Sequence, residues 1–350
     1  MSYERPTIRH PDAKKNSLGY TRKEYEGSIS TLCAGCGHDS ITHALITACF
    51  EMNLEPHRIV KLSGIGCSSK TPAYFLGRSH GFNSVHGRMP SVATGANMAN
   101  RELVYIGVSG DGDTASIGMG QFAHVVRRNL DMVYVVMNNG CYGLTKGQDS
   151  ATADRGSKTK KGRPVSLESI DLCEMAIQLG AGFVGRGFSG DKKQVVEMLK
   201  AAVAHKGLAF LDIISPCVSF NNVPTSTKSY AWVRAHEEAA LPFDFIPCCR
   251  EITVDYPQGS VLPVTLHDGS VINLYKQDDL MEITSRSAAM DALEQAKTEH
   301  RILTGILYLN PEQPDTHALL ETVTTPLNTM GREELCPGNA ELQRINDAFR

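Results

Sequence analysis

Two apolar runs, each followed by a turn rich in Asp, Asn and Gly, constrain the fold of this chain most. The run at 103–108 leads to Gly-Asp-Gly-Asp at 110–113, and the run at 132–137 leads to Asn-Asn-Gly at 138–140. Such runs are typical of buried strands, and the stretch 119–129 between them has helical spacing. A strand–loop–helix–strand–loop unit would place Asp111 and Asn139 at the carboxyl ends of neighbouring parallel strands, where open α/β sheets bind ligands.

The polar residues in these turns suit a divalent cation that holds a diphosphate. Mg²⁺ prefers oxygen ligands and takes only a few from protein, so the Asp111 carboxylate, the Asn139 amide and the backbone carbonyl of Cys141 would serve. Gly110 and Gly112 would let the backbone approach the phosphates closely. The pattern is neither a P-loop nor a dinucleotide fingerprint. It resembles the thiamine diphosphate fingerprint; the alternative is two unrelated Asx-Gly turns.

Four of the ten cysteines lie at turns that could hold a metal group. Cys33 and Cys36 form a C-x2-C pair, Cys67 follows the strand-like stretch 58–62, and Cys217 follows the strand-like stretch 209–214. Such a set could bind zinc or a 4Fe–4S cluster, and its spacing alone does not separate these from buried, unreactive cysteines. No targeting segment begins the chain and no apolar run reaches the ~18 residues of a membrane span. We therefore expect a cytoplasmic protein with reduced thiols and no membrane contact.

The motifs together resemble the beta subunit of 2-oxoacid:ferredoxin oxidoreductases, over nearly the whole chain. With its tail segment 305–311, the pattern is most similar to the 2-oxoglutarate type. The resemblance rests on Cys33-Ala-Gly-Cys36-Gly-His38, Gly64-Ile-Gly-Cys67-Ser, His86-Gly-Arg88, Gly110-Asp-Gly-Asp113, Asn138-Asn-Gly-Cys-Tyr-Gly-Leu-Thr-Lys-Gly-Gln148, and Ser215-Pro-Cys217 with Asn221-Asn222 beyond it.

This resemblance implies a set of cofactor ligands. Cys33, Cys36, Cys67 and Cys217 would ligate one 4Fe–4S cluster, and Asp111, Asn139 and the Cys141 carbonyl would hold Mg²⁺. The residues expected to contact thiamine diphosphate are Ile65, Gly66, Cys67, Ser68, His86, Gly110, Gly112, Asp113, Gly143 and Leu144.

The same resemblance implies the reaction and the partners. The expected reaction is the reversible oxidative decarboxylation of 2-oxoglutarate to succinyl-CoA, with electrons passing through the cluster to ferredoxin. Pyruvate or broad 2-oxoacid specificity, a thiamine decarboxylase or synthase without redox chemistry, and a zinc-stabilised subunit without catalysis are the alternatives. Because the chain contains only one doubly wound set of segments, the activating glutamate is expected from an alpha subunit, in an (αβ)₂ heterotetramer.

Substrate selection is expected from residues at the edge of the thiamine site. A distal carboxylate on the substrate needs a cation, whereas pyruvate does not. Lys70, Arg88 and Lys146 are the candidate cations, although Lys70 could equally be a solvated turn residue. Leu144 is a further candidate selector, and His86 a candidate contact to a diphosphate oxygen.

The predicted fold is α/β: a doubly wound, mostly parallel sheet of the thiamine diphosphate-binding type with a C-terminal α+β extension. We expect an N-terminal arm at 1–27, the α/β domain at 28–230 and an extension at 231–350 that packs on the core or on a partner. Further helices are expected at 167–179, 191–205 and 285–297, and further strands at 182–187, 261–266 and 271–275, the last two joined by a turn at Asp268-Gly269. Residues from about 328 are expected to be loosely ordered. The net charge of −3 and the scattered basic residues do not favour nucleic-acid binding.

Overall fold

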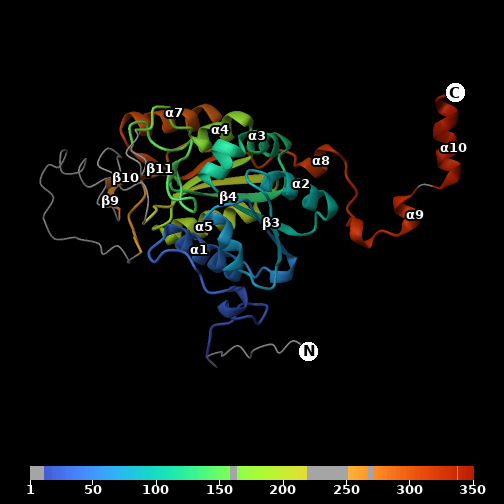
Figure 1. Ribbon diagram of the computed structural model, residues 1–350, viewed down its shortest axis with the longest axis horizontal. Coiled ribbons are helices and arrows are strands. Elements are labelled where there is room, and N and C mark those ends of the chain that lie inside the picture. The colour runs from blue at the N-terminus through green and yellow to red at the C-terminus, as the bar shows by residue number, and fades with distance from the viewer. Residues whose placement is uncertain (1–11, 158–163, 219–250, 267–270, 337) are drawn as a thin grey trace, which may run out of the picture.

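The computed structural model describes residues 12–157, 164–218, 251–266, 271–336 and 338–350. Its centre is a nine-stranded sheet in the order β2-β1-β3-β4-β8-β7-β11-β10-β9. Figure 1 labels β3, β4, β9, β10 and β11 of this sheet. All neighbours from β2 to β7 run parallel. The strands are β1 Ile59–Ser63, β2 His80–Asn83, β3 Val104–Gly110, β4 Met132–Asn138, β7 Phe183–Phe188, β8 Leu208–Ile214, β9 Val261–Thr265, β10 Val271–Lys276 and β11 Ile302–Leu309.

Helices cover both faces of this sheet, as the doubly wound prediction requires. On one face α1 (Gly37–Glu51) and α5 (Lys192–Ala204) bury aliphatic side chains against the strands. On the other face lie α2 (Met89–Ala99), α3 (Met119–Arg128), α4 (Leu172–Leu179) and α7 (Arg286–Thr298). The two layers are visible above and below the sheet in Figure 1. The predicted α/β fold is therefore confirmed.

Most predicted elements lie within a residue or two of their observed bounds, and the exception has a local cause. The helix predicted from residue 167 begins at Leu172, because Asp171 has extended backbone and its carboxylate accepts hydrogen bonds from the backbone amides of Cys173 and Glu174. This is an N-cap, which ends the preceding loop and starts the helix. The short strand β2 and the π-helical turn at Gly112–Ile117 are elements that the sequence pattern did not predict.

The predicted C-terminal extension packs on the core by continuing its sheet. β11 pairs antiparallel with β7, β10 pairs parallel with β11, and β9 pairs antiparallel with β10. Thr265 faces Val271 across the last pair, while the turn predicted at 268–269 lies outside the described residues. The domain boundary at 230/231 also lies outside them, and the proposed division into arm, core and extension stays a prediction.

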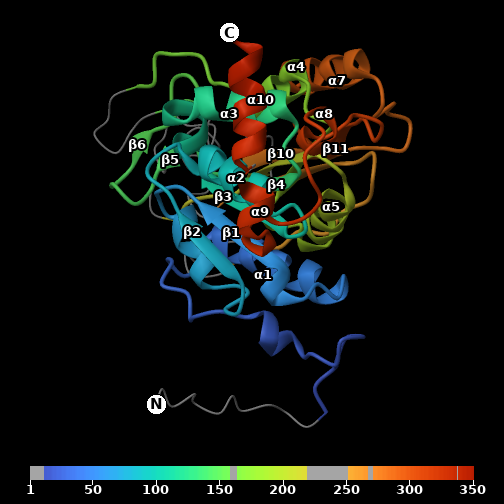
Figure 2. The same cartoon turned by 90° about the vertical axis from the view of Figure 1, so that its right-hand side faces the viewer.

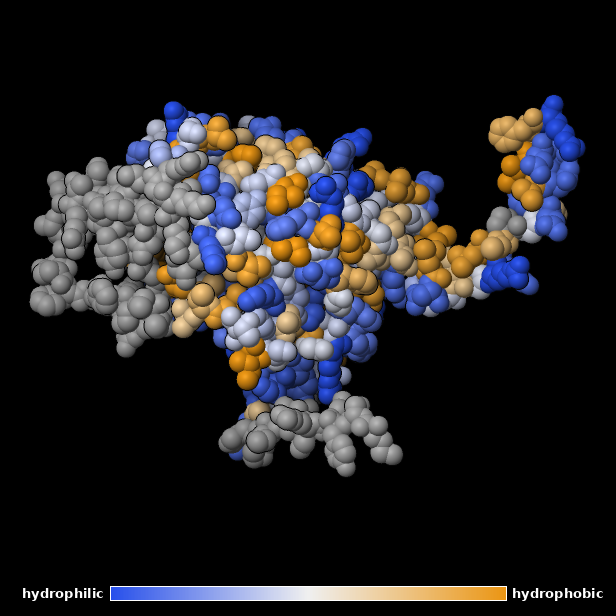
Figure 3. Space-filling model, viewed as in Figure 1, coloured by the Kyte–Doolittle hydropathy of each residue, from blue (hydrophilic) through white to orange (hydrophobic). Residues whose placement is uncertain are grey.

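After β11 the chain continues as a tail that leaves the body of the molecule. It contains α8 (Thr316–Leu319), α9 (Arg332–Leu335) and α10 (Asn339–Ala348), and neither α9 nor α10 buries a residue. Figure 1 shows α10 projecting away from the sheet, and Figure 2 shows α9 and α10 in front of the body, seen from the side of the tail. Figure 3 shows apolar side chains along this tail. The loose order expected from about residue 328 stays a prediction, and the segment forms exposed helices. None of the described helices has the length and hydrophobicity needed to cross a membrane.

Candidate functional site

One pocket opens where β1, β3 and β4 end, and it gathers most of the predicted cofactor residues. All ten residues predicted to contact thiamine diphosphate line it, together with Asp111, Asn139 and Cys141. The remaining wall is made by His38, Met137, Tyr142 and Thr145. The predicted pairing of β3 with β4 explains this convergence, since the two strands run parallel and bring Asp111 and Asn139 to one edge. The strand–loop–helix–strand–loop prediction is therefore confirmed.

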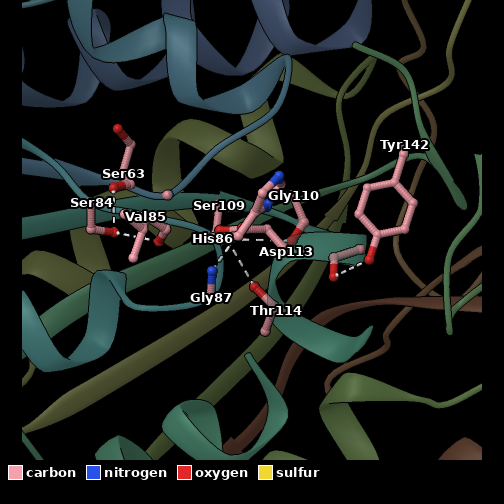
Figure 4. A network of polar contacts seen from close by, with 12 residues as sticks. Ser63, Ser84, Val85, His86, Gly87, Ser109, Gly110, Asp113, Thr114 and Tyr142 are labelled. Atoms are coloured by element: carbon pink, nitrogen blue, oxygen red, sulfur yellow. Dashed lines mark hydrogen bonds and ion pairs between the residues drawn. The ribbon is translucent and has the colours of Figure 1, made fainter. Parts of the chain in front are cut away.

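Asp113 anchors the side of the pocket next to β1 and β3 (Figure 4). Its Oδ1 lies 2.6 Å from Nδ1 of His86 and accepts a 2.9 Å hydrogen bond from the Gly87 amide, while its Oδ2 accepts from the Ser109 hydroxyl at 3.0 Å. A β-carbon at Gly64 would collide with this carboxylate, so only glycine fits there. These contacts fix the ring of His86 at the pocket wall.

Asp111 anchors the opposite side and is almost completely buried. Its carboxylate accepts hydrogen bonds from the backbone N–H of Asn139 at 3.2 Å, from the Thr152 hydroxyl at 2.8 Å and from the Ser150 hydroxyl. Burial raises the pKa of Asp111, and the two hydroxyl donors oppose that rise. A buried carboxylate that is costly to ionise gains most from a cation nearby.

The turn after β4 carries the two other predicted metal ligands, the side-chain oxygen of Asn139 and the backbone carbonyl of Cys141. The side-chain oxygen of Asn139 accepts from the Cys141 amide at 3.1 Å, which folds the turn back on itself. Tyr142 donates through its hydroxyl to the Gly112 carbonyl at 2.8 Å, and a β-carbon at Gly112 would meet the Tyr142 ring at 2.5 Å. Glycine at 112 thus lets the ring lie directly against the backbone of the 110–113 loop.

The polar groups of this pocket fit a diphosphate with its cation. Ser68 is buried and its hydroxyl has no hydrogen-bond partner among the described residues, although it faces the pocket. A buried, unpaired hydroxyl is costly and indicates a ligand that it would bind. The oxygens of Asp111, Asn139 and Cys141 are the hard donors that Mg²⁺ prefers. The residues present therefore fit the group that the sequence indicates.

The four predicted cluster cysteines gather next to this pocket. A β-carbon at Gly143 would lie 3.3 Å from the Cys67 sulfur and 4.0 Å from the Cys217 sulfur, so both sulfurs face the same stretch of backbone. Burial raises the pKa of Cys36 to about 12, with Cys217 and Cys67 adding to the rise, and burial and Cys217 also raise the pKa of Cys67. A cation bound between these thiols would lower their pKa values and favour the thiolate form.

The cysteines are close but are not arranged as a closed metal site. Within the ranges that the structure describes, no three His, Cys, Asp or Glu side chains converge as ligands of one ion. Cys36 is buried, Cys67 and Cys217 are half-buried, and Cys33 is exposed. The set of soft thiol donors fits a cluster or zinc, since both take four sulfurs.

His38 braces two of the cysteine-bearing segments. Its Nδ1 lies 2.6 Å from the Ser215 hydroxyl, which joins the start of α1 to the end of β8. A β-carbon at Gly37 would meet the same hydroxyl at 2.7 Å. Burial lowers the pKa of His38 to about 4, so the ring is neutral at pH 7. This contact between His38 and Ser215 joins the segment that carries Cys36 to the segment that carries Cys217.

The three candidate cations for substrate lie outside the pocket wall. Lys70, Arg88 and Lys146 are exposed and do not line the pocket, whereas Leu144 lines it with about half of its side chain exposed. Lys70 is close enough to Cys67 to lower the pKa of that thiol, against the larger effect of burial. Lys146 has a positive φ of 78°, an uncommon backbone conformation for a residue with a side chain.

Several residues that shape the site were not singled out from the sequence. Ser150 and Thr152 hold Asp111 through their hydroxyls, a role that the sequence analysis did not assign to them. Behind them, Asn138 donates to Asp212, and Arg186 pairs with both Asp212 and Asp171. Burial raises the pKa of Asp212 to about 6, which Arg186 partly offsets. The signal in the sequence was an Asp and an Arg inside apolar strands, where charges are rare.

Comparison with known proteins agrees with the geometry of the pocket. Residues 64–213 match the thiamine pyrophosphate enzyme family, C-terminal TPP-binding domain. The chain is 41% identical over 220 residues to a 2-oxoacid:ferredoxin oxidoreductase subunit beta from Sulfolobus, covering 63% of this chain and 71% of the relative. It is 37% identical to a 2-oxoglutarate synthase subunit KorB from Methanocaldococcus jannaschii, covering 58% of this chain and 74% of the relative.

A solved structure extends the likeness to almost the whole chain. A 2-oxoglutarate:ferredoxin oxidoreductase from Magnetococcus marinus, solved with 2-oxoglutarate, coenzyme A and succinyl-CoA bound, superposes with a TM-score of 0.72 at 26% identity. The match covers 96% of this chain and 99% of that one. The family predicted from the cysteine and Gly-Asp-Gly motifs is confirmed: this chain belongs to the beta subunits of the 2-oxoacid:ferredoxin oxidoreductases.

Proposed function

We propose that this chain carries thiamine diphosphate, Mg²⁺ and one 4Fe–4S cluster, and that it acts on 2-oxoglutarate together with an alpha subunit. The reaction would be 2-oxoglutarate plus coenzyme A giving succinyl-CoA, CO₂ and one proton, with two electrons passing singly to ferredoxin. The observation that carries the proposal is the position of Cys67, which lines the pocket while its sulfur and that of Cys217 both face Gly143. A cluster beside the cofactor would favour oxidation after loss of CO₂ over simple protonation, because it can accept electrons one at a time.

Each pocket residue has a defined part in this proposal. Asp111, Asn139 and the Cys141 carbonyl would hold Mg²⁺, and the unpaired Ser68 hydroxyl would donate to the diphosphate. His86, oriented by Asp113, would donate to an oxygen at the pocket wall. When bound, thiamine diphosphate supplies the carbon nucleophile and the electron sink for loss of CO₂, and the cluster supplies a one-electron acceptor.

The rim of the pocket supports the proposal that an alpha subunit completes the site. Phe82, Val85, Ile117 and Leu144 are each between 45% and 71% exposed on segments that border the pocket. Exposed apolar side chains that gather around a polar pocket are typical of an interface. An alpha subunit seated there would exclude water and bring the activating glutamate, and two such pairs would form the proposed heterotetramer.

Substrate choice is proposed to lie in exposed residues that the assembled interface would enclose. Lys70 is the preferred partner for a distal carboxylate, because it lies next to Cys67 on the 3-10 helix Ser68–Ala73. Arg88 and Lys146 are the further cation candidates, and Leu144 would set the space available. A pyruvate-specific enzyme would need none of the three cations.

The test is to purify the chain under anaerobic conditions with and without its alpha partner. We expect about four irons, about four sulfides and one thiamine per chain in the complex. We also expect coenzyme A-dependent dye reduction by 2-oxoglutarate, in the complex only. Zinc in place of iron would overturn the electron-transfer role, and a preference for pyruvate would overturn the substrate assignment.

A matched pair of serine variants tests the cluster assignment. Cys67→Ser removes a proposed ligand, so we expect loss of the cluster's visible absorption and a fall in dye reduction of at least about a hundredfold, since a hydroxyl is a poor iron ligand. Cys336→Ser changes an exposed thiol in the tail and should leave both unchanged. Equal iron content in the two variants would contradict the proposal.

A further inference from the structure

The amide of Asn138 has only one possible orientation. Asn138 ends β4 and precedes Asn139. Its Nδ2 donates to Oδ1 of Asp212 at 3.1 Å, while its Oδ1 accepts from the Gly140 amide at 3.3 Å and from the Thr152 hydroxyl at 3.1 Å. A carboxylate can only accept and a backbone amide can only donate, so these partners fix which end of the Asn138 amide faces which way.

Asp212 is held on its other side by Arg186. The strand order β4-β8-β7 places Asn138, Asp212 and Arg186 on three adjacent strands, and Asp212 faces Arg186 in register. Arg186 Nε lies 3.4 Å from Oδ2 of Asp212, and Arg186 Nη2 lies 2.5 Å from Oδ1 of Asp171. The two oxygens of Asp212 thus face two different partners: Oδ1 accepts a hydrogen bond from Asn138, and Oδ2 forms an ion pair with Arg186.

We propose that Asp212 is a positioning residue for the cofactor loop at 138–141. It would act through Asn138, whose amide bonds Gly140 and Thr152, and Thr152 in turn bonds Asp111. The loop so held carries Asn139 and Cys141, and Asp111 faces it. The inference rests on the proposed function, because the affected property is the binding of thiamine diphosphate with Mg²⁺.

The two different partners of the Asp212 oxygens make Asp212→Asn an informative substitution. Asparagine has one oxygen and one NH₂ group, and the cation at Arg186 would take the oxygen. The NH₂ group would then face the NH₂ of Asn138 and force that amide to turn over, which sets its NH₂ against the Gly140 N–H. Asparagine has nearly the same volume as aspartate, and these side chains line an open pocket, so the substitution causes no overpacking. The expected defect is therefore one of orientation.

Asp171→Asn is the matched control. It removes the same charge from the other side of Arg186, but Asp171 has no hydrogen bond to Asn138. Asparagine is also as good an N-cap as aspartate, so α4 keeps its start. Both variants should lower the melting temperature, because each leaves Arg186 with one carboxylate. Only Asp212→Asn should alter the cofactor loop.

The experiment uses the alpha–beta complex, stripped of thiamine diphosphate and Mg²⁺ by chelation and gel filtration. Titration calorimetry measures the dissociation constant of thiamine diphosphate at saturating Mg²⁺ and of Mg²⁺ at saturating thiamine diphosphate. We expect Asp212→Asn to raise both about tenfold, as for other residues that orient metal ligands, and Asp171→Asn to change them less than twofold. Equal constants for wild type and Asp212→Asn, or an equal rise in both variants, would overturn the inference.

A second substitution separates positioning from a general loss of structure. Asn138→Ala should weaken binding as Asp212→Asn does, and the double variant should be no weaker than Asn138→Ala alone, because Asp212 acts only through Asn138. Additive losses would overturn the inference, and Asn138→Ala carries the test should Asp212→Asn not fold. If the wild-type complex itself binds no thiamine diphosphate, the proposed function fails, which is a distinct outcome.

Discussion

The amino and carboxyl edges of the parallel strands both bury polar side chains, but they satisfy them differently. At the amino edge, Asn129 accepts from the Leu208 amide at 2.8 Å and donates to the Pro314 carbonyl at 3.0 Å. Nearby, His317 lies 2.7 Å from the Asn97 amide oxygen and 2.7 Å from the Thr322 hydroxyl. These neutral groups are paired with one another and tie the tail to the core.

The carboxyl edge instead buries two carboxylates around a pocket. Asp111 and Asp113 are buried there within one pocket, and the Ser68 hydroxyl has no partner among the residues described. Such groups cost stability in the free chain and gain it back when a cation or phosphate arrives. We infer that the polar groups described at the amino edge contribute to folding stability, whereas those at the carboxyl edge contribute to ligand binding.

The largest expected effect comes from substituting one polar residue at the carboxyl edge and, separately, one at the amino edge. Asp111→Asn should weaken binding of thiamine diphosphate with Mg²⁺ by about 10- to 100-fold and leave the melting temperature of the free chain equal or higher, because a buried charge is removed. Asn129→Ala should do the reverse. It loses two hydrogen bonds and puts alanine at a φ of 49°, which costs about 2–4 kcal/mol of unfolding free energy.

Calorimetry and thermal unfolding of the same two preparations check this prediction. The proposed difference between the edges is contradicted if Asp111→Asn lowers the melting temperature while cofactor affinity stays the same. It also breaks if Asn129→Ala weakens cofactor binding more than twofold.

A smaller effect on the free energy of unfolding is expected from substituting alanine for Gly64 or Gly95, which have different surroundings. A β-carbon at Gly64 would displace the Asp113 carboxylate and so loosen His86, whereas nothing lies within 4 Å of a β-carbon at Gly95 in α2. Gly64→Ala should cost about 1–3 kcal/mol, and Gly95→Ala should stabilise by about 0.5–1 kcal/mol. Denaturant unfolding of both variants measures the two signs; a stabilising Gly64→Ala would show that the Asp113 contacts are not rigid.

The smallest effect is expected at the base of the tail and depends on pH. Burial lowers the pKa of His317 below 6.5, with Arg101 adding to the shift. The unfolded tail therefore binds a proton first as pH falls, and stability present at pH 7 is lost as pH drops through 6.5. Hydrogen exchange at 316–322, corrected for intrinsic rates, should be faster at pH 5.5 than at pH 7.5. His317→Asn should lack this dependence, and a pH-independent wild type would contradict the prediction.

Local patterns were enough to predict the pocket, because its parts follow consecutive strands. The two Asx-Gly turns around Asp111 and Asn139 needed only strand order to meet, and parallel pairing of β3 with β4 supplied it. The start of α4 could have been read from Asp171, whose side chain caps the helix, so this error came from overlooking a known signal.

Long-range pairings were beyond the sequence. That β11 would join the core sheet beside β7, 119 residues earlier at the closest paired positions, depends on edges that only the assembled core presents. The contacts of Ser150 and Thr152 with Asp111 are similar, because a hydroxyl in a polar loop gives no sign of its distant partner. The same holds for Arg186, which joins two carboxylates from different elements.

The antiparallel course of β11 also decides where a probe can be attached. Because Leu309 pairs with Phe183, the first residue of β7, the last strand ends at the amino edge, and the tail departs from the side opposite the pocket. A fluorophore or affinity handle at the end of α10 would therefore have no direct contact with thiamine diphosphate. Any change in its signal when an alpha subunit is added would report the approach of that subunit to the tail, independently of whether the pocket is filled.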